Sequence, residues 1–114
     1  MNSCIFCKIA SGEIPSNKVY EDEKVLAFRD IKPVAPLHIL VVPKKHYVSI
    51  MDIPAEDMDI TAHICSVIQK IAIDEGIAAD GFRVVINCGK NGGQEVDHLH
   101  YHVLAGRNLT WPPG

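Results

Sequence analysis

The segment HLHYHVL, residues 98–104, constrains the possible fold more than any other stretch of this sequence. Its histidines stand at alternate positions, and apolar residues fill the positions between and after them. Because side chains alternate across a β-strand, this pattern predicts a strand on which His98, His100 and His102 share one face. The residues between the histidines then pack on a core on the other side of that strand.

Other parts of the chain complete a coarse picture. Apolar residues at helical spacing predict one long amphipathic helix from about Ala55 to Glu75, with Pro54 at its start and Gly76 at its end. A short N-terminal helix is expected to stop near Gly12. Strand-like runs cover residues 18–21, 24–30, 37–43, 82–88 and 98–106, the first two close enough for a tight hairpin. We therefore predict an α+β fold with a five-stranded antiparallel sheet, one long helix and one short helix.

Length, charge and apolar runs limit the function. The 114 residues suit a single domain, 1–114, and the net charge of -3 gives no electrostatic basis for binding nucleic acid or an anionic membrane. No apolar run approaches the roughly 20 residues that span a bilayer, and the N-terminus lacks a hydrophobic signal stretch, so we expect a cytoplasmic protein. Disulfides are not expected in that reducing compartment; Cys65 is predicted to be a core residue of the long helix, and Cys88 has no assigned role.

Three aligned imidazoles allow two kinds of chemistry. They could bind a divalent metal, although ligands at every second strand position spread too far for all three to meet one ion easily. Alternatively, the middle histidine is a nucleophile or general base, a role for which the near-neutral pKa of imidazole is suited. The glycine-rich segment NCGKNGGQEVDH stands directly upstream and could place backbone amides around a phosphate. A histidine beside such a loop favours attack on phosphorus.

The residue pattern alone does not assign a role to two further features, His38 and the pair Cys4 and Cys7. His38 is predicted to share a strand face with apolar neighbours, where a lone histidine is usually a core residue. Cys4 and Cys7 form a C-x-x-C motif, which fits a redox site or a tetrahedral zinc site with two of the six histidines. The spacing does not say which two, although His63 is expected to be an exposed helix residue. A metal-handling or redox protein is therefore one possible function.

The motif HLHYHVL resembles the histidine-triad signature of the HIT superfamily, in which the histidines alternate with apolar residues. The similarity continues through CIFCKIASGEIP, AFRDIKPVAPLHILVVPKKH, VVINCGKNGGQEV and the terminal WPPG, and it spans Cys4 to Gly114. In these segments the chain looks like the Hint branch, the purine nucleoside phosphoramidases. The resemblance implies a HIT fold that dimerises through the long helix and a strand edge into a ten-stranded sheet.

The resemblance also implies a reaction. Members of this branch hydrolyse the P–N bond of nucleoside 5′-phosphoramidates through a covalent nucleotidyl-histidine and release AMP or GMP. By motif position, His100 would be the nucleophile, His102 a phosphate contact, and His38 the imidazole that assists proton transfer at the leaving group. The other implied contacts are Asn87 and the Gly93–Gln94 backbone for phosphate, Asp30 for the ribose hydroxyls, and Ile5, Phe6, Phe28 and Ile31 for the purine.

A zinc site follows from the same resemblance. It matches Cys4, Cys7, His46 and His98 to the ligands of a structural Zn²⁺ ion, closed by four protein ligands. Such an ion would pin the N-terminal segment to the histidine strand. No organic cofactor is implied, and of the triad only His98 then belongs to the metal.

Two further positions and one alternative complete the expectations. Some Hint enzymes have a phosphate-contacting serine where this chain has Glu95. Because a carboxylate would repel phosphate, we expect Glu95 to turn outward or to use only its backbone amide. Trp111 matches a tryptophan that reaches the partner's active site in dimeric relatives. The alternative function is a purine-nucleotide-binding regulatory or scaffold protein whose hydrolysis is incidental.

Overall fold

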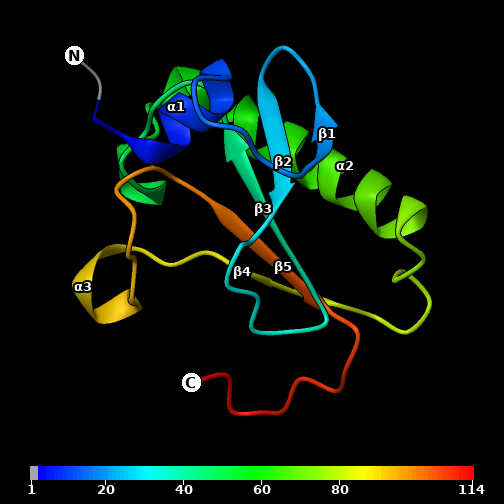
Figure 1. The fold of residues 1–114 in the computed structure, drawn as a ribbon. Coiled ribbons are helices and arrows are strands. Elements are labelled where there is room, and N and C mark those ends of the chain that lie inside the picture. The colour runs from blue at the N-terminus through cyan, green and yellow to red at the C-terminus, as the bar shows by residue number, and fades with distance from the viewer. Residues whose placement is uncertain (1–2) are drawn as a thin grey trace.

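Five strands form one antiparallel sheet in the order β1-β2-β3-β5-β4 in the computed structural model, which describes residues 3–114 (Figure 1). The strands are β1 (Lys18–Glu21), β2 (Val25–Arg29), β3 (Leu37–Pro43), β4 (Arg83–Val85) and β5 (Tyr101–Ala105). The helices are α1 (Ile5–Ser11), α2 (Asp59–Asp74) and a four-residue turn, α3 (Gly89–Gly92). The predicted α+β fold is confirmed, with α3 as an addition. Within the described residues, no helix combines the length and apolar character needed to cross a membrane.

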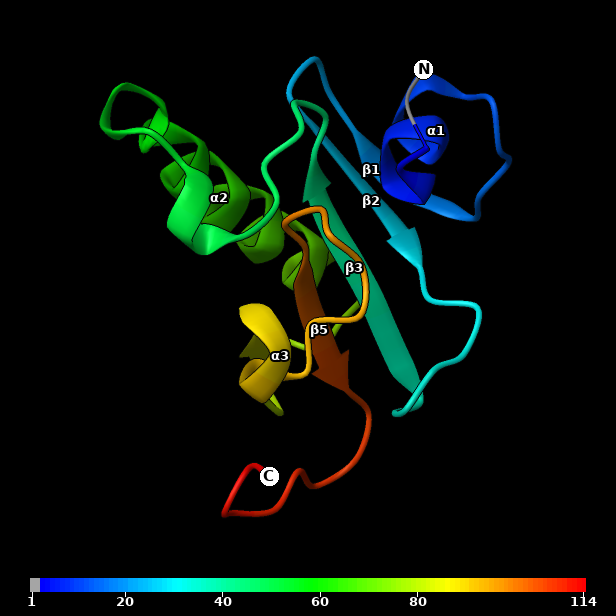
Figure 2. The same cartoon turned by 90° about the vertical axis from the view of Figure 1, so that its left-hand side faces the viewer.

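The two faces of the sheet carry separate apolar clusters, with α2 on one side and α1 on the other (Figure 2). Alternate residues of β3 divide between them: Ile39 and Val41 pack under α2, whereas Leu40 and Val42 pack with Phe6 of α1. The predicted apolar stripe of α2 is buried and consists of Ile60, Ile64, Val67, Ile68 and Ile71. Complete burial of one such side chain contributes about 1.5–3 kcal/mol, so this face is a major source of stability.

The histidine segment follows the predicted alternation, but its strand is shorter than predicted. Leu99, Tyr101 and Val103 lie in the cluster under α2, while the histidines face α1. The strand β5 begins at Tyr101 rather than at residue 98, because β3 ends at Pro43, which has no amide hydrogen to continue the ladder. The Pro43 carbonyl instead accepts a hydrogen bond from His98 Nε2 at 2.8 Å.

The ends of the other strands and of α1 show where local sequence signals are sufficient to predict the bounds of an element. The bounds predicted for β1 and β3, residues 18–21 and 37–43, are confirmed. The helix α1 ends at Gly12 as predicted, and this glycine adopts the left-handed conformation with φ 87°. The strand β4 covers Arg83–Val85 rather than the predicted 82–88, because only these three residues pair with β5.

The long helix differs from its prediction in two respects. Its predicted first turn is a separate 3-10 turn, Ala55–Asp57, and α2 begins at Asp59. The Asp57 carboxylate accepts a hydrogen bond from the Tyr47 hydroxyl at 2.7 Å, which holds this turn against the loop after β3. Cys65 is exposed rather than in the core, because it stands one position off the buried stripe.

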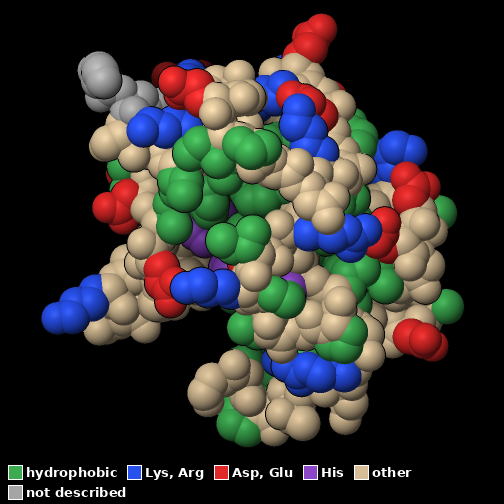
Figure 3. Space-filling view, in the orientation of Figure 1, with side chains coloured by type: hydrophobic (Ala, Val, Ile, Leu, Met, Phe, Trp, Pro, Cys, Tyr) green, Lys and Arg blue, Asp and Glu red, His purple; other side chains and the backbone are tan. Residues whose placement is uncertain are grey.

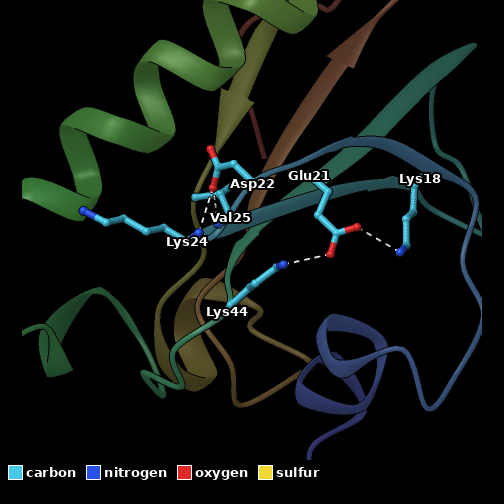
Figure 4. A network of polar contacts seen from close by, with 6 residues as sticks. All are labelled: Lys18, Glu21, Asp22, Lys24, Val25 and Lys44. Atoms are coloured by element: carbon cyan, nitrogen blue, oxygen red, sulfur yellow. Dashed lines mark hydrogen bonds and ion pairs between the residues drawn. The ribbon is translucent and has the colours of Figure 1, made fainter.

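A network around Asp22 ties the β1–β2 hairpin to α2. Asp22 Oδ1 accepts hydrogen bonds from the backbone amides of Lys24 and Val25, both at 2.8 Å, and so closes the predicted tight turn (Figure 4). Asp22 Oδ2 accepts a hydrogen bond from the Tyr20 hydroxyl at 2.7 Å and lies 2.6 Å from His63 Nε2. The expected exposed His63 is therefore half-buried and hydrogen-bonded, because the hairpin lies against α2.

Candidate functional site

A cleft of about 680 Å³ opens on the face of the sheet that α1 partly covers. In the space-filling view, apolar side chains surround histidine rings in this hollow (Figure 3). Its walls come from α1, β2 and β3, and from Gly93, Glu95 and Val96 in the loop ahead of β5. The predicted site residues that line it are His38, His100, His102, Asp30, Asn87, Gly93, Ile5, Phe6, Phe28 and Ile31. Gln94 and Trp111 lie outside this lining.

His100 is buried at the base of the cleft with one ring nitrogen directed by the backbone. Its Nδ1 donates a hydrogen bond to the carbonyl oxygen of His98 at 2.7 Å. In a neutral ring the proton is then on Nδ1, and Nε2 keeps its lone pair. The ring packs edge-on against Phe6, with centroids 5.1 Å apart, and against His102 at 4.9 Å. His100 therefore has the protonation pattern of a nitrogen nucleophile.

His38 and His102 form a directed pair of imidazoles beside it. The Val34 amide donates to His38 Nδ1 at 3.2 Å, which places the proton of the neutral His38 ring on Nε2. His38 Nε2 lies 2.9 Å from His102 Nδ1, so His38 donates and His102 accepts. The proton of His102 is then on Nε2, and this ring is a hydrogen-bond donor at the cleft.

Burial keeps both of these rings neutral. Desolvation lowers the pKa of His38, although the charge of Asp30 opposes the shift. Desolvation, followed by the nearby His100 and His38 rings, lowers the pKa of His102 to about 4. Both rings are therefore uncharged near neutral pH, as the hydrogen-bond directions require.

Asp30, His38 and His102 also bring three potential metal-ligand atoms within 4.8 Å of one another. Asp30 Oδ2 lies 3.4 Å from His38 Nε2, and Asp30 Oδ1 accepts a hydrogen bond from the Lys32 amide at 2.9 Å. Because the Val34 contact puts a proton on His38 Nε2, that atom has no lone pair to offer a metal. The cluster therefore fits a hydrogen-bond relay rather than a metal site.

The glycine-rich loop differs from its expected role as a phosphate cradle. The amides of Gly93 and Gln94 both donate at 3.1 Å to carbonyls of α3, from Lys90 and Gly89 respectively, because Gly93 closes that turn in the left-handed conformation. Neither amide is therefore available to a phosphate in this arrangement. Asn87 remains as a half-buried side chain that lines the cleft.

Two further residues of this loop, Gln94 and Glu95, lie at or beside the cleft. Gln94 acts as a brace, since its Nε2 donates to the carbonyls of Val48 at 2.6 Å and Val96 at 3.0 Å. Glu95 belongs to the lining of the cleft, next to Gly93 and Val96, and its side chain is exposed.

The other end of the cleft is apolar and includes one residue that sequence reasoning missed. Phe6 and Phe28 meet edge-to-face with centroids 5.7 Å apart, while Ile5 and Ile31 are exposed at the rim. Ser16 also lines this end, and its buried hydroxyl has no hydrogen-bond partner within residues 3–114. The sequence offered no signal for this role, because a serine after Pro15 is typical of an ordinary turn.

The four predicted zinc ligands converge beside the cleft. Cys4 Sγ lies 3.3 Å from His98 Nδ1, and Cys7 Sγ lies 3.3 Å from His46 Nδ1 and 3.5 Å from His98 Nδ1. The two Nδ1 atoms are 3.1 Å apart, and all four ligand atoms lie within 4.8 Å. Zn–S bonds of about 2.3 Å and Zn–N bonds of about 2.1 Å separate tetrahedral ligands by roughly 3.4–3.8 Å. The donor set therefore fits zinc.

The surroundings of His98 favour the same conclusion. His98 is fully buried, and its Nε2 donates to the Pro43 carbonyl at 2.8 Å, which leaves the Nδ1 lone pair directed at the two sulfur atoms. Such a second hydrogen bond is the usual way in which proteins orient a metal-binding histidine. Cys4 is also the N-cap of α1, so an ion here would connect that helix to the segment that carries His100.

Trp111 stands apart from these groups. It lies in the segment after β5, is 80% exposed and takes no part in the lining of the cleft. In a single chain, the structure therefore brings together every predicted site residue except this one and the Gln94 side chain.

Comparison with known proteins gives consistent matches over nearly the whole chain. The HIT domain profile matches residues 11–109. The 14 kDa zinc-binding protein of Zea mays is 49% identical over 112 residues, which cover 96% of this chain and 87% of that protein. A histidine triad protein from Clostridium difficile shares 65% identity at a TM-score of 0.94, over 96% of each chain. A HIT family hydrolase from Legionella pneumophila Philadelphia 1 shares 51% identity at a TM-score of 0.96, over 98% of this chain and 100% of that chain.

Proposed function

This chain belongs to the HIT domain family, and we propose that it hydrolyses the P–N bond of purine nucleoside 5′-phosphoramidates, releasing AMP or GMP. The observation that carries the proposal is the pairing of His100 and His102. One ring directs an unprotonated Nε2 at the cleft and its neighbour offers an Nε2–H donor, as attack on an anionic phosphorus centre requires. Similarity to the Legionella HIT family hydrolase supports hydrolysis as the reaction class.

In the first step the lone pair of His100 Nε2 attacks the α-phosphorus. The P–Nε2 bond forms and the P–N bond to the amine breaks, with its electron pair going to the amine nitrogen. That nitrogen needs a proton. The anionic phosphate raises the pKa of the adjacent His102, so the His38–His102 pair takes up one proton from solvent when the substrate binds, and His102 Nε2 delivers a proton to the leaving amine.

In the second step water attacks the nucleotidyl-histidine. A P–O bond forms, the P–Nε2 bond breaks with its electron pair returning to His100, and the proton of the water passes to His102. The nucleoside monophosphate leaves and the two imidazoles regain their starting state. The hydrogen bond from His100 Nδ1 to the His98 carbonyl stabilises the positive charge that His100 carries in the intermediate.

Substrate binding is proposed along the length of the cleft. The apolar end around Phe6 and Phe28 takes the purine, Asp30 accepts hydrogen bonds from the ribose hydroxyls, and the Asn87 amide with His102 contacts the phosphate oxygens. We further propose a homodimer that joins two sheets into ten strands. The exposure of Trp111 outside its own cleft supports a position against the partner subunit.

We propose that Cys4, Cys7, His46 and His98 hold a structural zinc ion. The ion would supply a fixed tetrahedral link and no chemistry of the reaction. Similarity to the zinc-binding protein of maize and the convergence of the four ligand atoms support this assignment.

A second candidate function is nucleotide binding for regulation, with incidental hydrolysis. The specific observation in its favour is that the Gly93 and Gln94 amides are already engaged, which leaves fewer donors for charge that develops in the transition state. It predicts tight binding of a purine nucleotide without significant turnover.

The experiment that separates the two is hydrolysis of a fluorogenic adenosine 5′-phosphoramidate, with nucleotide binding measured by calorimetry. Turnover by the wild type, its loss in His100→Ala and retention in His63→Gln, a histidine outside the cleft, support the phosphoramidase. A quenched reaction should then contain one nucleotidyl group per protein. Tight AMP binding without turnover in the folded, zinc-loaded wild type would identify the regulatory function instead.

A further inference from the structure

Glu95 is an acidic residue of the cleft in which a phosphate is proposed to bind. It lines the cleft between Gly93 and Val96, and its side chain is exposed. Val96 packs against the α1-side cluster, and Gln94 is hydrogen-bonded through its side chain. The residues on both sides of Glu95 are thus anchored, so its backbone is held at the cleft and its carboxylate lies within the length of one side chain from it.

The charge of Glu95 is not offset within the described part of the chain. Across residues 3–114, no ion pair involves this carboxylate, whereas several other acidic side chains are paired, among them Glu21, Asp22, Asp57 and Glu75. Arg29 and Lys32 line the same cleft. Arg29 is paired with Glu75 at 2.7 Å, which leaves Lys32 as the internal candidate to balance Glu95.

The direction of the substrate brings its leaving group to Glu95. In the proposed pose the purine lies near Phe6, the phosphorus lies beside His100, and the amine lies on the side where Gly93 and Glu95 line the cleft. An uncharged amine would leave the phosphate charge and the carboxylate to repel each other. A cationic group on the amine would lie near the carboxylate and offset that repulsion.

We infer that Glu95 selects phosphoramidates whose leaving amine carries a second, positively charged group. The inference rests on the proposed function, because it specifies the leaving group of the same reaction. It makes Glu95 a specificity-determining residue and predicts that diamines, or amines with a cationic side chain, are the preferred leaving groups.

The test compares three adenosine 5′-phosphoramidates that differ only at the far end of a linear leaving amine. This end is an ammonium, a methyl group or a carboxylate, on chains of equal length. For the wild type, kcat/KM should rank ammonium above methyl above carboxylate, by about two- to fivefold per step, and the ranking should shrink as salt is raised. Glu95→Gln should abolish the ranking and Glu95→Lys should reverse it.

The control is Asp97→Asn, which removes an exposed charge of the same loop that is outside the cleft lining and should keep the wild-type ranking. Turnover without a ranking, or a ranking that persists in Glu95→Gln, overturns the inference. A ranking that appears only in Lys32→Met would show that Lys32 neutralises Glu95, and also overturns it. Absence of turnover with all three substrates contradicts the proposed function itself.

Discussion

The same strands form both faces of the sheet, but the buried side chains are apolar on one face and include histidines on the other. Under α2, β3 and β5 contribute Ile39, Val41 and Val103, which are fully buried and need no polar partner. On the other face the same strands contribute His38 and His102, whose ring nitrogens need hydrogen bonds in defined directions. A one-residue slip of β5 would exchange the two sets. The apolar face therefore fixes the register on which the cleft depends.

The difference also has an energetic side. Burial under α2 stabilises the fold, whereas burial beside the cleft lowers the pKa values of His38 and His102 and so destabilises their charged forms. The cleft face thus keeps its rings neutral, and the cost in stability grows only as the pH falls below the ordinary pKa of imidazole, 6.5. Substitutions on the two faces should separate activity from stability.

The largest effect is expected for His100→Ala. Loss of the attacking nitrogen should lower kcat/KM by about 10³-fold or more, while the melting temperature shifts by only a few degrees. Steady-state hydrolysis and thermal unfolding of the same preparation check both values. Activity above one tenth of the wild type would show that another group makes the attack.

Removal of zinc should lower the stability of the whole fold, because the ion would connect α1 to the segment that carries His100. A zinc concentration 1,000 times the dissociation constant stabilises the fold by about 4 kcal/mol, and a chelator should remove that amount. Denaturant unfolding with and without chelator measures the effect, and elemental analysis gives the stoichiometry. The double variant Cys4→Ser, Cys7→Ser is the control and should not respond to the chelator; a wild type that is equally unresponsive contradicts the zinc assignment.

On the face that α2 covers, Ile64→Ala should lower stability and leave activity nearly unchanged, which is the opposite of the result expected for His100→Ala. Ile64 is fully buried under the sheet, so the truncation should lower the free energy of unfolding by about 2–5 kcal/mol. Below the melting temperature, kcat/KM should stay within about twofold of the wild type. A large loss of activity in the still-folded variant would mean that the two faces are not separable.

A drop in pH should lower the free energy of unfolding, because the pKa of His102 is lower in the folded chain than in the unfolded chain. Its pKa in the folded chain, about 4, lies below the ordinary value of 6.5, so between these values the unfolded chain binds more protons. The free energy of unfolding therefore falls as the pH drops through that window. In His102→Gln, which keeps a hydrogen-bond acceptor for His38, the fall should be smaller by about 1–2 kcal/mol, allowing for partial exposure. Equal pH profiles for the two proteins would contradict the lowered pKa.

The smallest effect concerns Ser16. Its buried hydroxyl has no partner within residues 3–114, so Ser16→Ala should leave stability unchanged or raise it by up to about 1 kcal/mol. If the bound nucleotide supplies the missing partner, the same change should weaken AMP binding by a few fold. Calorimetry measures the affinity, and Ser11→Ala, on an exposed turn of α1, is the control. Unaltered affinity would exclude Ser16 as a nucleotide contact.

The fold was largely predictable because its signals are local. The apolar run of residues 37–43, the apolar stripe of α2 and the stop at Gly12 are each signals that depend on neighbours within a few positions. The start of β5 was not predictable, since it depends on Pro43, more than fifty residues away in the chain, at the end of the adjacent strand.

The site was predictable in its residue types and less so in its contacts. The alternation of His98, His100 and His102 indicated one functional face, yet only the family resemblance divided those rings between metal and nucleotide. The glycines of this segment allow the left-handed conformation, which Gly89 and Gly93 adopt, but the direction of the Gly93 amide depends on the carbonyls of α3. The direction of a backbone hydrogen bond depends on the folded turn, so the composition of the segment does not predict it.

The bond from His100 Nδ1 to the His98 carbonyl joins two residues that are only two positions apart. The protonation pattern of the proposed nucleophile is therefore set within residues 98–100, and it stays the same when this segment moves as a unit. Distant parts of the protein can shift this piece, tilt it or close over it without changing which nitrogen holds the proton. Positioning and reactivity of the nucleophile can consequently vary independently, so a relative with a reshaped cleft can accept another leaving group and still attack with the same atom.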